Sequence, residues 1–192
     1  MALKLTDSRS SILEPYKKNR FIFQIENGGD GANNDAWSKL AFVCHTVTVP
    51  TLAYGEIAMN RLNDTFFAAG KVQFTELNAS FYDYIVGADS AGQIMYNWGA
   101  SIYDLTTGTS SYKAEYTRNA VVAQLDPKGS VARLWNIFYM WPKNVTFGES
   151  LTAADDAVCE VTASFRFDYA IKTPDSALPS TLTALGANLT GI

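Results

Sequence analysis

The segment that decides the fold is CEVTASFRFDYAI, which runs from Cys159 to Ile171. Apolar or aromatic side chains stand at every second position from Cys159 onward, and mainly polar side chains stand between them. An alternation with a period of two places one set of side chains on each face of a β-strand. The segment therefore predicts a long strand that buries one face and exposes the other to water.

The segment 131–141 has a different pattern, because Arg133 and Asn136 are its only strongly polar residues. A strand that is apolar on both faces is usually covered on both sides. The sequence Asp126-Pro127-Lys128-Gly129, which precedes it, has the composition of a tight turn. We expect this turn to join residues 117–125 and 131–141 in a β-hairpin.

Other segments are rich in β-branched and aromatic residues and predict further strands. They are residues 20–26, 39–49, 52–59, 71–84 and 117–125. Within 71–84 the apolar positions change parity near Thr75 and Glu76, so a single regular strand would expose half of them. A β-bulge or bend at this point would keep all of them buried.

One α-helix is predicted after Ser90, which is a suitable N-cap. The apolar residues that follow lie on one helical face. They are Ala91, Ile94, Met95, Trp98 and Ile102. Gly92 and Gly99 each weaken the helix by roughly 1 kcal/mol relative to alanine. Its stability must therefore come from packing the apolar face on the sheet.

The length and composition of the chain favour one folded domain with irregular ends. The chain has 192 residues, of which 47% are hydrophobic and 18% charged. We expect an N-terminal arm at 1–17, one β domain at 18–171 and a small, polar C-terminal extension at 172–192. No segment reaches the roughly 20 apolar residues of a membrane span, and the first residues lack a signal peptide. These features predict a protein made in a cytoplasm without a membrane partner.

Few side chains are suited to catalysis or to metal binding. His45 is the only histidine, and we expect it to face its neighbours in a sheet. Cys44 and Cys159 lie in strand-like segments and are predicted to be buried free thiols. The net charge is −4 and the longest basic run is Lys17-Lys18, which argues against tight binding of nucleic acid. We therefore predict no catalytic site, no metal and no cofactor.

An ordered set of short motifs resembles the tail tube proteins of contractile-tailed bacteriophages. This family shares its fold with the tubes of type VI secretion and other contractile injection systems, and the similarity covers residues 18–171. The motifs are Asn19-Arg20-Phe21, Phe42-Val43-Cys44, Val47-Thr48-Val49-Pro50, Met59-Asn60-Arg61, FTELNASF from Phe74 to Phe81, Trp141-Pro142-Lys143-Asn144-Val145 and EVTASFRFDY from Glu160 to Tyr169. The tryptophan-proline segment followed by the final strand is the most specific part.

The resemblance implies a mainly β fold, an antiparallel β-barrel or sandwich with one flanking α-helix and a long extended hairpin. It also implies hexameric rings that stack into a tube, with a hairpin that reaches the neighbouring ring. By position this hairpin is residues 52–74, with 59–70 as its tip. Its candidate contact residues are Tyr54, Ile57, Met59, Arg61, Leu62, Phe66 and Phe67. Most of them are too apolar for a free loop, which supports a contact between subunits.

The same resemblance implies a hollow channel through which DNA passes without specific binding. Acidic side chains on the channel wall would repel phosphate and let DNA slide. The candidates are Glu56, Asp64, Glu76, Glu160 and Asp168. The implied partners are further copies of the chain, a tail sheath protein, a baseplate or tube initiator and a tape measure protein inside the channel. The implied location is the virion tail, after assembly in the host cytoplasm.

Three alternative functions remain open at the level of the sequence. The chain could form the inner tube of a non-viral contractile injection system, or a single baseplate or terminator ring with the same fold. From a different class, it could be a monomeric β-sandwich that binds carbohydrate through its tryptophans. The last alternative requires that Trp37, Trp98, Trp135 or Trp141 be exposed.

Overall fold

Strand β9 (Val131–Thr146) is the longest strand of the sheet. The computed structural model describes residues 15–26, 34–85, 87–148, 151–154 and 156–174. Strand β8 (Arg118–Leu125) pairs with one edge of β9, and β10 (Glu160–Arg166) and β11 (Tyr169–Lys172) follow each other along the other edge. All of these pairings are antiparallel.

The sheet curls until its two ends meet. Its strand order is β1-β8-β9-β10-β5-β2, with β1 at Phe21–Ile25, β5 at Leu77–Tyr82 and β2 at Cys44–Val47. The ring of Phe23 on β1 lies 6.1 Å from that of Phe165 on β10 and 6.3 Å from that of Phe81 on β5. Strands β1 and β2, at opposite ends of the order, also contact each other. The predicted mainly β, antiparallel barrel or sandwich fold is therefore confirmed.

The alternating segment at 159–171 forms β10 and β11, with an interruption at Phe167 and Asp168. Val161, Ala163 and Phe165 are buried on one face of β10, as the period of two predicts. At the interruption the Asp168 amide donates to the Phe138 carbonyl, so pairing with β9 is resumed at β11. Thr173 continues this pairing through its amide and the Leu134 carbonyl.

The predicted hairpin turn at Asp126 is confirmed, and the predicted break near Thr75 is present, but Val72 before the break is 53% exposed and not buried. The apolar phase change at Thr75–Glu76 separates β4 (Asp64–Phe74) from β5, and the two strands belong to different sheets. The Asp126 turn joins β8 to β9, and the Asp126 side chain accepts hydrogen bonds from the amides of Lys128 and Ser130. Gly129 has a φ of 86°, a conformation that glycine adopts without steric cost.

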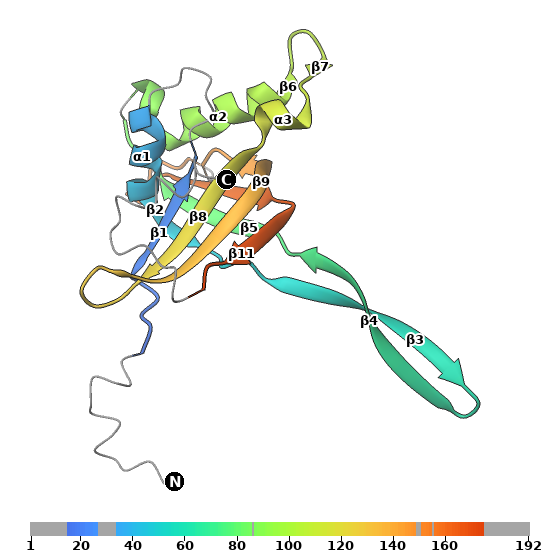
Figure 1. Ribbon diagram of the computed structural model, residues 1–192. Helices are drawn as coiled ribbons and strands as arrows, with labels where there is room; N and C mark the ends of the chain where they lie inside the picture. The colour runs from blue at the N-terminus through green and yellow to red at the C-terminus, as the bar shows by residue number, and fades with distance from the viewer. Residues whose placement is uncertain (1–14, 27–33, 86, 149–150, 155, 175–192) are drawn as a thin grey trace, which may run out of the picture.

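Helix α2 (Ala91–Ile102) begins at the predicted N-cap, because the Gln93 amide donates to the Ser90 side chain at 3.2 Å. Its buried residues are Ala91, Ile94, Met95 and Trp98. Short elements surround it. They are η3 (Gly87–Asp89), β6 (Tyr103–Asp104), β7 (Thr109–Ser110) and α3 (Lys113–Tyr116). Helix α2 lies across one end of the sheet (Figure 1).

The structure adds a helix where the sequence predicts the start of a strand. Residues 39–49 were predicted to be extended and the flanking helix to be single, but α1 occupies Asn34–Val43 and only Cys44–Val47 is a strand. Trp37 and Leu40 lie on one helical face and are buried against the core, with the Trp37 and Trp98 rings 5.5 Å apart. This burial overrides the local β preference of Phe42 and Val43.

His45 faces neighbouring strands, as predicted, whereas only one thiol is sheltered. The His45 ring stacks on Tyr82 with centroids 4.2 Å apart. Cys44 is half-buried and its thiol donates to the Thr46 carbonyl. Cys159 is exposed, so the prediction that it is buried is wrong. The reason is its position, because it precedes β10 at the end of the sheet, beyond the core.

The two cysteines are expected to differ in reactivity with a thiol reagent. Burial raises the pKa of the Cys44 thiol to about 12, and the thiolate is the reactive form. At pH 8 only about one Cys44 thiol in ten thousand is then ionised, and its labelling should accelerate as the pH rises toward 12. Mass spectrometry of the folded protein after maleimide treatment at pH 8 should find label on Cys159 alone. Label on both, as in the denatured chain, would contradict this environment for Cys44.

Candidate assembly interface

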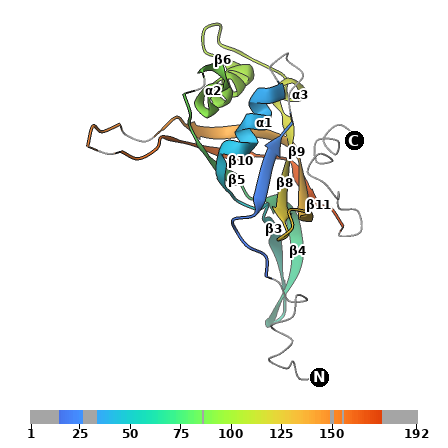
Figure 2. The same ribbon diagram turned by 90° about the vertical axis from the view of Figure 1, so that its left-hand side faces the viewer.

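A long two-stranded hairpin leaves the body of the molecule and is exposed over most of its length. Among the described strands, β3 (Leu52–Arg61) and β4 (Asp64–Phe74) pair only with each other. Figures 1 and 2 show the hairpin projecting away from the sheet, at the end opposite to α1 and α2. Every residue of β3 is exposed. The position predicted for the hairpin is therefore correct, but its strands continue to Arg61 and from Asp64, so the tip is only Leu62 and Asn63.

The exposed residues of this hairpin include all of the predicted contact residues. Leu62 is 99% exposed, and the other large apolar side chains of the set are at least half exposed. The predicted contact residues that the structure brings together here are Tyr54, Ile57, Met59, Arg61, Leu62, Phe66 and Phe67. An apolar surface of this extent on a projecting element is typical of a protein–protein contact.

Apolar side chains lie on both faces of the hairpin. Near the body, Tyr54 pairs with Val72, and farther out Met59 pairs with Phe66. Residues 54 and 59 differ in parity, so these two pairs lie on opposite faces of the ribbon. The strand register shifts between Tyr54 and Glu56, where β4 holds one extra residue. The hairpin thus presents an inner apolar patch, Tyr54 and Val72, on one face and an outer apolar patch, Met59 and Phe66, on the other. Phe67, which pairs with Ala58, lies in the outer half on the face of the inner patch.

Two glycines allow the strands to approach closely at the register shift. A Cβ atom on Gly70 would lie 3.1 Å from the carbonyl carbon and oxygen of Gly55. A Cβ atom on Gly55 would meet its nearest atom, the Lys71 carbonyl oxygen, at 3.4 Å. Glycines at bulges commonly serve this purpose.

The Gly70→Ala substitution is therefore expected to loosen the outer half of the hairpin. The new methyl group would push against the backbone of Gly55, whereas Gly55→Ala places its methyl group at an ordinary contact distance. Hydrogen exchange of the amides at 56–69 should accelerate several-fold in Gly70→Ala and change little in the matched Gly55→Ala variant. Equal exchange in both variants would show that the close approach at Gly70 is unimportant.

The five candidate acidic residues do not form one group. Glu56 and Asp64 lie on the hairpin. The other three lie on or beside the sheet and each has a basic neighbour. The pairs are Glu76 with Lys143, Glu160 with His45 at 3.3 Å and Asp168 with Lys113 at 2.5 Å. The hydrogen bond from Lys143 lowers the pKa of Glu76. The ammonium groups of Lys143 and Lys113 therefore balance the charges of Glu76 and Asp168 within the chain.

A second surface, the polar sheet face, was not predicted as a site. It lies on the side of β2, β5 and β10 that faces away from the core. Ser164 pairs with Asn78 and Thr162 pairs with Ser80, so hydroxyl and amide groups stand in adjacent rows. Ser164 Oγ lies 2.6 Å from Asn78 Oδ1. The sequence contained a signal for this surface, because polar residues occupy alternate positions of both strands. That these polar residues form one continuous surface across the strands could be seen only from the strand register.

Metal-binding groups do not cluster in the part of the chain that the structure describes. Among those residues there is no group of three or more His, Cys, Asp or Glu side chains that could hold a metal ion. No helix in the described ranges is both long and apolar enough to cross a membrane. The hairpin and the polar sheet face are the two candidate functional surfaces.

Solved structures with the same architecture come from contractile injection systems. A chain of the sheath–tube complex of PVC, an extracellular contractile injection system, matches with a TM-score of 0.61 and 14% identity, over 90% of this chain and 99% of that one. The tube-terminating cap of the anti-feeding prophage matches with a TM-score of 0.63 and 14% identity, over 89% and 99%. This is the tail tube fold.

The tail tube fold confirms the resemblance that the sequence motifs indicate. The PVC sheath/tube terminator has it as well, with a TM-score of 0.61 and 15% identity over 85% of this chain and 100% of that one. No protein-family model matches the chain, and no curated protein sequence matches it significantly. The similarity is thus one of fold, and it extends over nearly the whole length of each matching structure.

Proposed function

We propose that this chain is a structural subunit of a tail tube, which forms hexameric rings that stack inside a contractile sheath. The observation that carries the proposal is the exposed apolar hairpin on a tail tube fold. An isolated subunit would leave this surface in water at a cost of about 25 cal/mol for each square ångström. Contact with further copies of the chain would bury it.

The apolar side chains on both faces of the hairpin support contact with two different neighbours. The inner patch, with Tyr54 and Val72, lies next to the body and would meet the neighbouring subunit of the same ring. The outer patch, with Met59 and Phe66, faces the other way and would meet a subunit of the next ring. Each patch would contact a surface unlike itself, so the association between copies is head-to-tail. Between rings, such an association can add copies without limit.

The polar face of β2, β5 and β10, on which Glu160 and Arg166 flank Thr162 and Ser164, is proposed to line the channel. Hydroxyl and amide groups offer phosphate no cluster of positive charge, and the nearby Arg166 guanidinium donates to the Phe74 carbonyl. Six copies of a chain with net charge −4 would give a ring with net charge −24. Together these features would let DNA slide through without binding. The acidic residues Glu56 and Asp64 remain proposed contributors to repulsion at the hairpin.

The remaining partners follow from the same proposal. A sheath protein would surround the tube, a baseplate protein would initiate it, and a tape measure protein would fill its channel during assembly. The assembled protein would belong to the virion tail and would have no enzymatic activity. The tube of a non-viral injection system, with protein as its cargo, is the nearest variant of this function.

A terminator or cap is the second candidate, because two of the matching structures are the tube-terminating cap and the sheath/tube terminator. A cap would form a single ring, whereas a tube subunit would form many. Copy number in purified particles distinguishes them, because a tube protein should be many times more abundant than a terminator.

The carbohydrate-binding alternative is not supported by the positions of the tryptophans. Trp37 and Trp98 are buried, and Trp135 and Trp141 are half-buried. A sugar-binding platform needs an exposed aromatic face. The described structure therefore offers no tryptophan platform for this alternative.

Sedimentation velocity over a range of protein concentrations tests the proposed function. A tube subunit should form species that grow with concentration, and high salt should not dissolve them, because apolar burial drives the contact. A single monomer peak at all concentrations, with or without a preformed baseplate as a nucleus, would contradict the proposal.

A further inference from the structure

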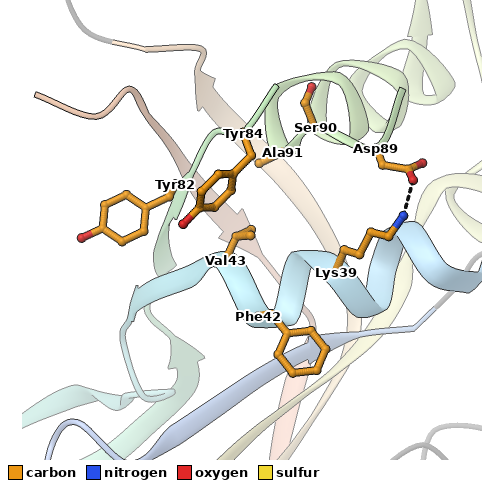
Figure 3. Close-up of a pocket in the computed structure, with 8 residues that line it drawn as sticks. All are labelled: Lys39, Phe42, Val43, Tyr82, Tyr84, Asp89, Ser90 and Ala91. Carbon is orange, nitrogen blue, oxygen red and sulfur yellow. Dashed lines mark hydrogen bonds and ion pairs between the residues drawn. The ribbon is translucent and has the colours of Figure 1, made fainter. Parts of the chain in front are cut away.

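An open hollow lies between helix α1 and the start of helix α2, on the end of the molecule that carries the helices. Its volume is about 180 Å³, which exceeds the roughly 150 Å³ in which an apolar cavity holds a benzene molecule. Its walls include Phe42 and Val43 of α1 and Tyr82 and Tyr84 of the segment that ends β5. Figure 3 shows Val43 and Tyr84 pointing toward each other across it.

The rim of this hollow carries one positive and one negative charge. Lys39 Nζ lies 2.5 Å from Asp89 Oδ2, and this ion pair closes one side of the hollow (Figure 3). Phe42 is 89% exposed although it is a large aromatic side chain on a helix. The hollow is thus an apolar site with a basic and an acidic group beside it.

The hairpin tip complements this hollow, because it carries a projecting apolar side chain between two charged residues. Leu62 is 99% exposed and adopts a φ of 54°, a conformation that is unfavourable for a leucine. Two-residue hairpin turns usually place asparagine, aspartate or glycine there. Neither turn geometry nor solubility therefore explains Leu62. Arg61 and Asp64 are register partners on either side of it, so the tip also carries one positive and one negative charge.

The two surfaces lie at opposite ends of the molecule and so cannot meet within one chain. In both views the hairpin extends away from the end that holds α1 and α2 (Figures 1 and 2). A projection at one end and a matching hollow at the other produce a head-to-tail contact between copies. We propose that Leu62 of one copy inserts into the hollow between α1 and α2 of an adjacent copy.

In this contact the charges at the tip match those at the rim. Arg61 would approach Asp89 of the adjacent copy, and Asp64 would approach its Lys39. Matched charges of this kind fix the orientation of a contact more than they strengthen it. The inference rests on the proposed function, since it names the surface of the next subunit that receives the hairpin.

Disulfide trapping tests this contact. The Cys159→Ser background removes the exposed native thiol and keeps the sheltered Cys44. In that background the Leu62→Cys, Tyr84→Cys double variant should form a ladder of covalent oligomers on mild oxidation, visible on a non-reducing gel. Leu62→Cys with Leu105→Cys is the matched control, because Leu105 is also exposed but does not line the hollow. The trapped fraction should be at least tenfold higher in the test pair.

The outcomes separate this inference from the proposed function. A ladder specific to Tyr84→Cys supports the contact, and Leu62→Ser should then raise the concentration needed for assembly by about tenfold or more. Large assemblies that trap equally at Leu105→Cys, or that do not trap, overturn the contact but leave the tube function standing. A chain that neither assembles at any concentration nor traps overturns both.

Discussion

Replacing Phe66 and Phe67 with serine is expected to abolish tube formation while leaving the folded subunit intact. Phe66 and Phe67 are 54% and 66% exposed, and they lie on opposite faces of the outer hairpin. Burying a phenylalanine side chain contributes about 1.5–3 kcal/mol. Losing two of them at each contact would lower the association constant by roughly two to four powers of ten. Electron microscopy and sedimentation should find only monomers or isolated rings.

The stability of the subunit should hardly change in this variant. Exposed side chains away from the core usually alter the free energy of unfolding by less than about 0.5 kcal/mol. The matched control is the Leu105→Ser, Tyr112→Ser variant, in which both replaced residues are 81% exposed and lie outside the hairpin. The control should still assemble. Tubes of normal length from the Phe66→Ser, Phe67→Ser chain would contradict the role proposed for the outer half of the hairpin.

The Trp98→Ala substitution is expected to cause the largest loss of stability, about 3–5 kcal/mol. Trp98 is 1% exposed, and its ring lies 5.5 Å from Trp37 and 5.7 Å from Phe165. Its indole Nε1 donates to the Tyr116 carbonyl at 2.7 Å. The substitution would leave a cavity where α1, α2 and β10 meet, and would remove that hydrogen bond. A domain with a typical stability of roughly 5–15 kcal/mol would lose a large share of it.

Urea unfolding followed by circular dichroism measures this loss. Tyr96→Ala is a suitable control, because Tyr96 is on the same helix but is 53% exposed. It should shift the free energy of unfolding by less than about 1 kcal/mol. If Trp98→Ala and Tyr96→Ala unfold at the same urea concentration, then α2 does not pack on the core as described.

The elements with a clear internal period could be predicted from the sequence. The alternation at 159–171 predicted β10 and β11, and the spacing after Ser90 predicted α2 together with its cap. In both cases the local pattern and the tertiary burial agree. The parity change near Thr75 likewise marks the point where the chain leaves the hairpin and enters the main sheet.

Helix α1 could not be predicted because its local and tertiary preferences disagree. Phe42 and Val43 favour a strand, and the helix is held by Trp37 and Leu40, whose partners lie far away in the sequence. The composition of the hairpin predicted that it is a contact surface. That apolar cross-strand pairs lie on both faces of the hairpin became visible only with the strand register.

Part of the candidate site likewise could not be predicted, because it is formed by residues that are distant in the sequence. The three acidic residues Glu76, Glu160 and Asp168 each acquire a basic neighbour from another element. The polar sheet face and the hollow between α1 and α2 arise from pairing and packing of residues that are 30 or more positions apart in the sequence. A single sequence gives no spacing that would connect such positions.

Negative-stain electron microscopy of the purified protein over a range of concentrations tests the central claim most directly. The account predicts rings with six-fold symmetry and hollow tubes that lengthen as the concentration rises, either spontaneously or after addition of baseplate. A uniform population of monomers at high concentration, with baseplate present, would contradict it.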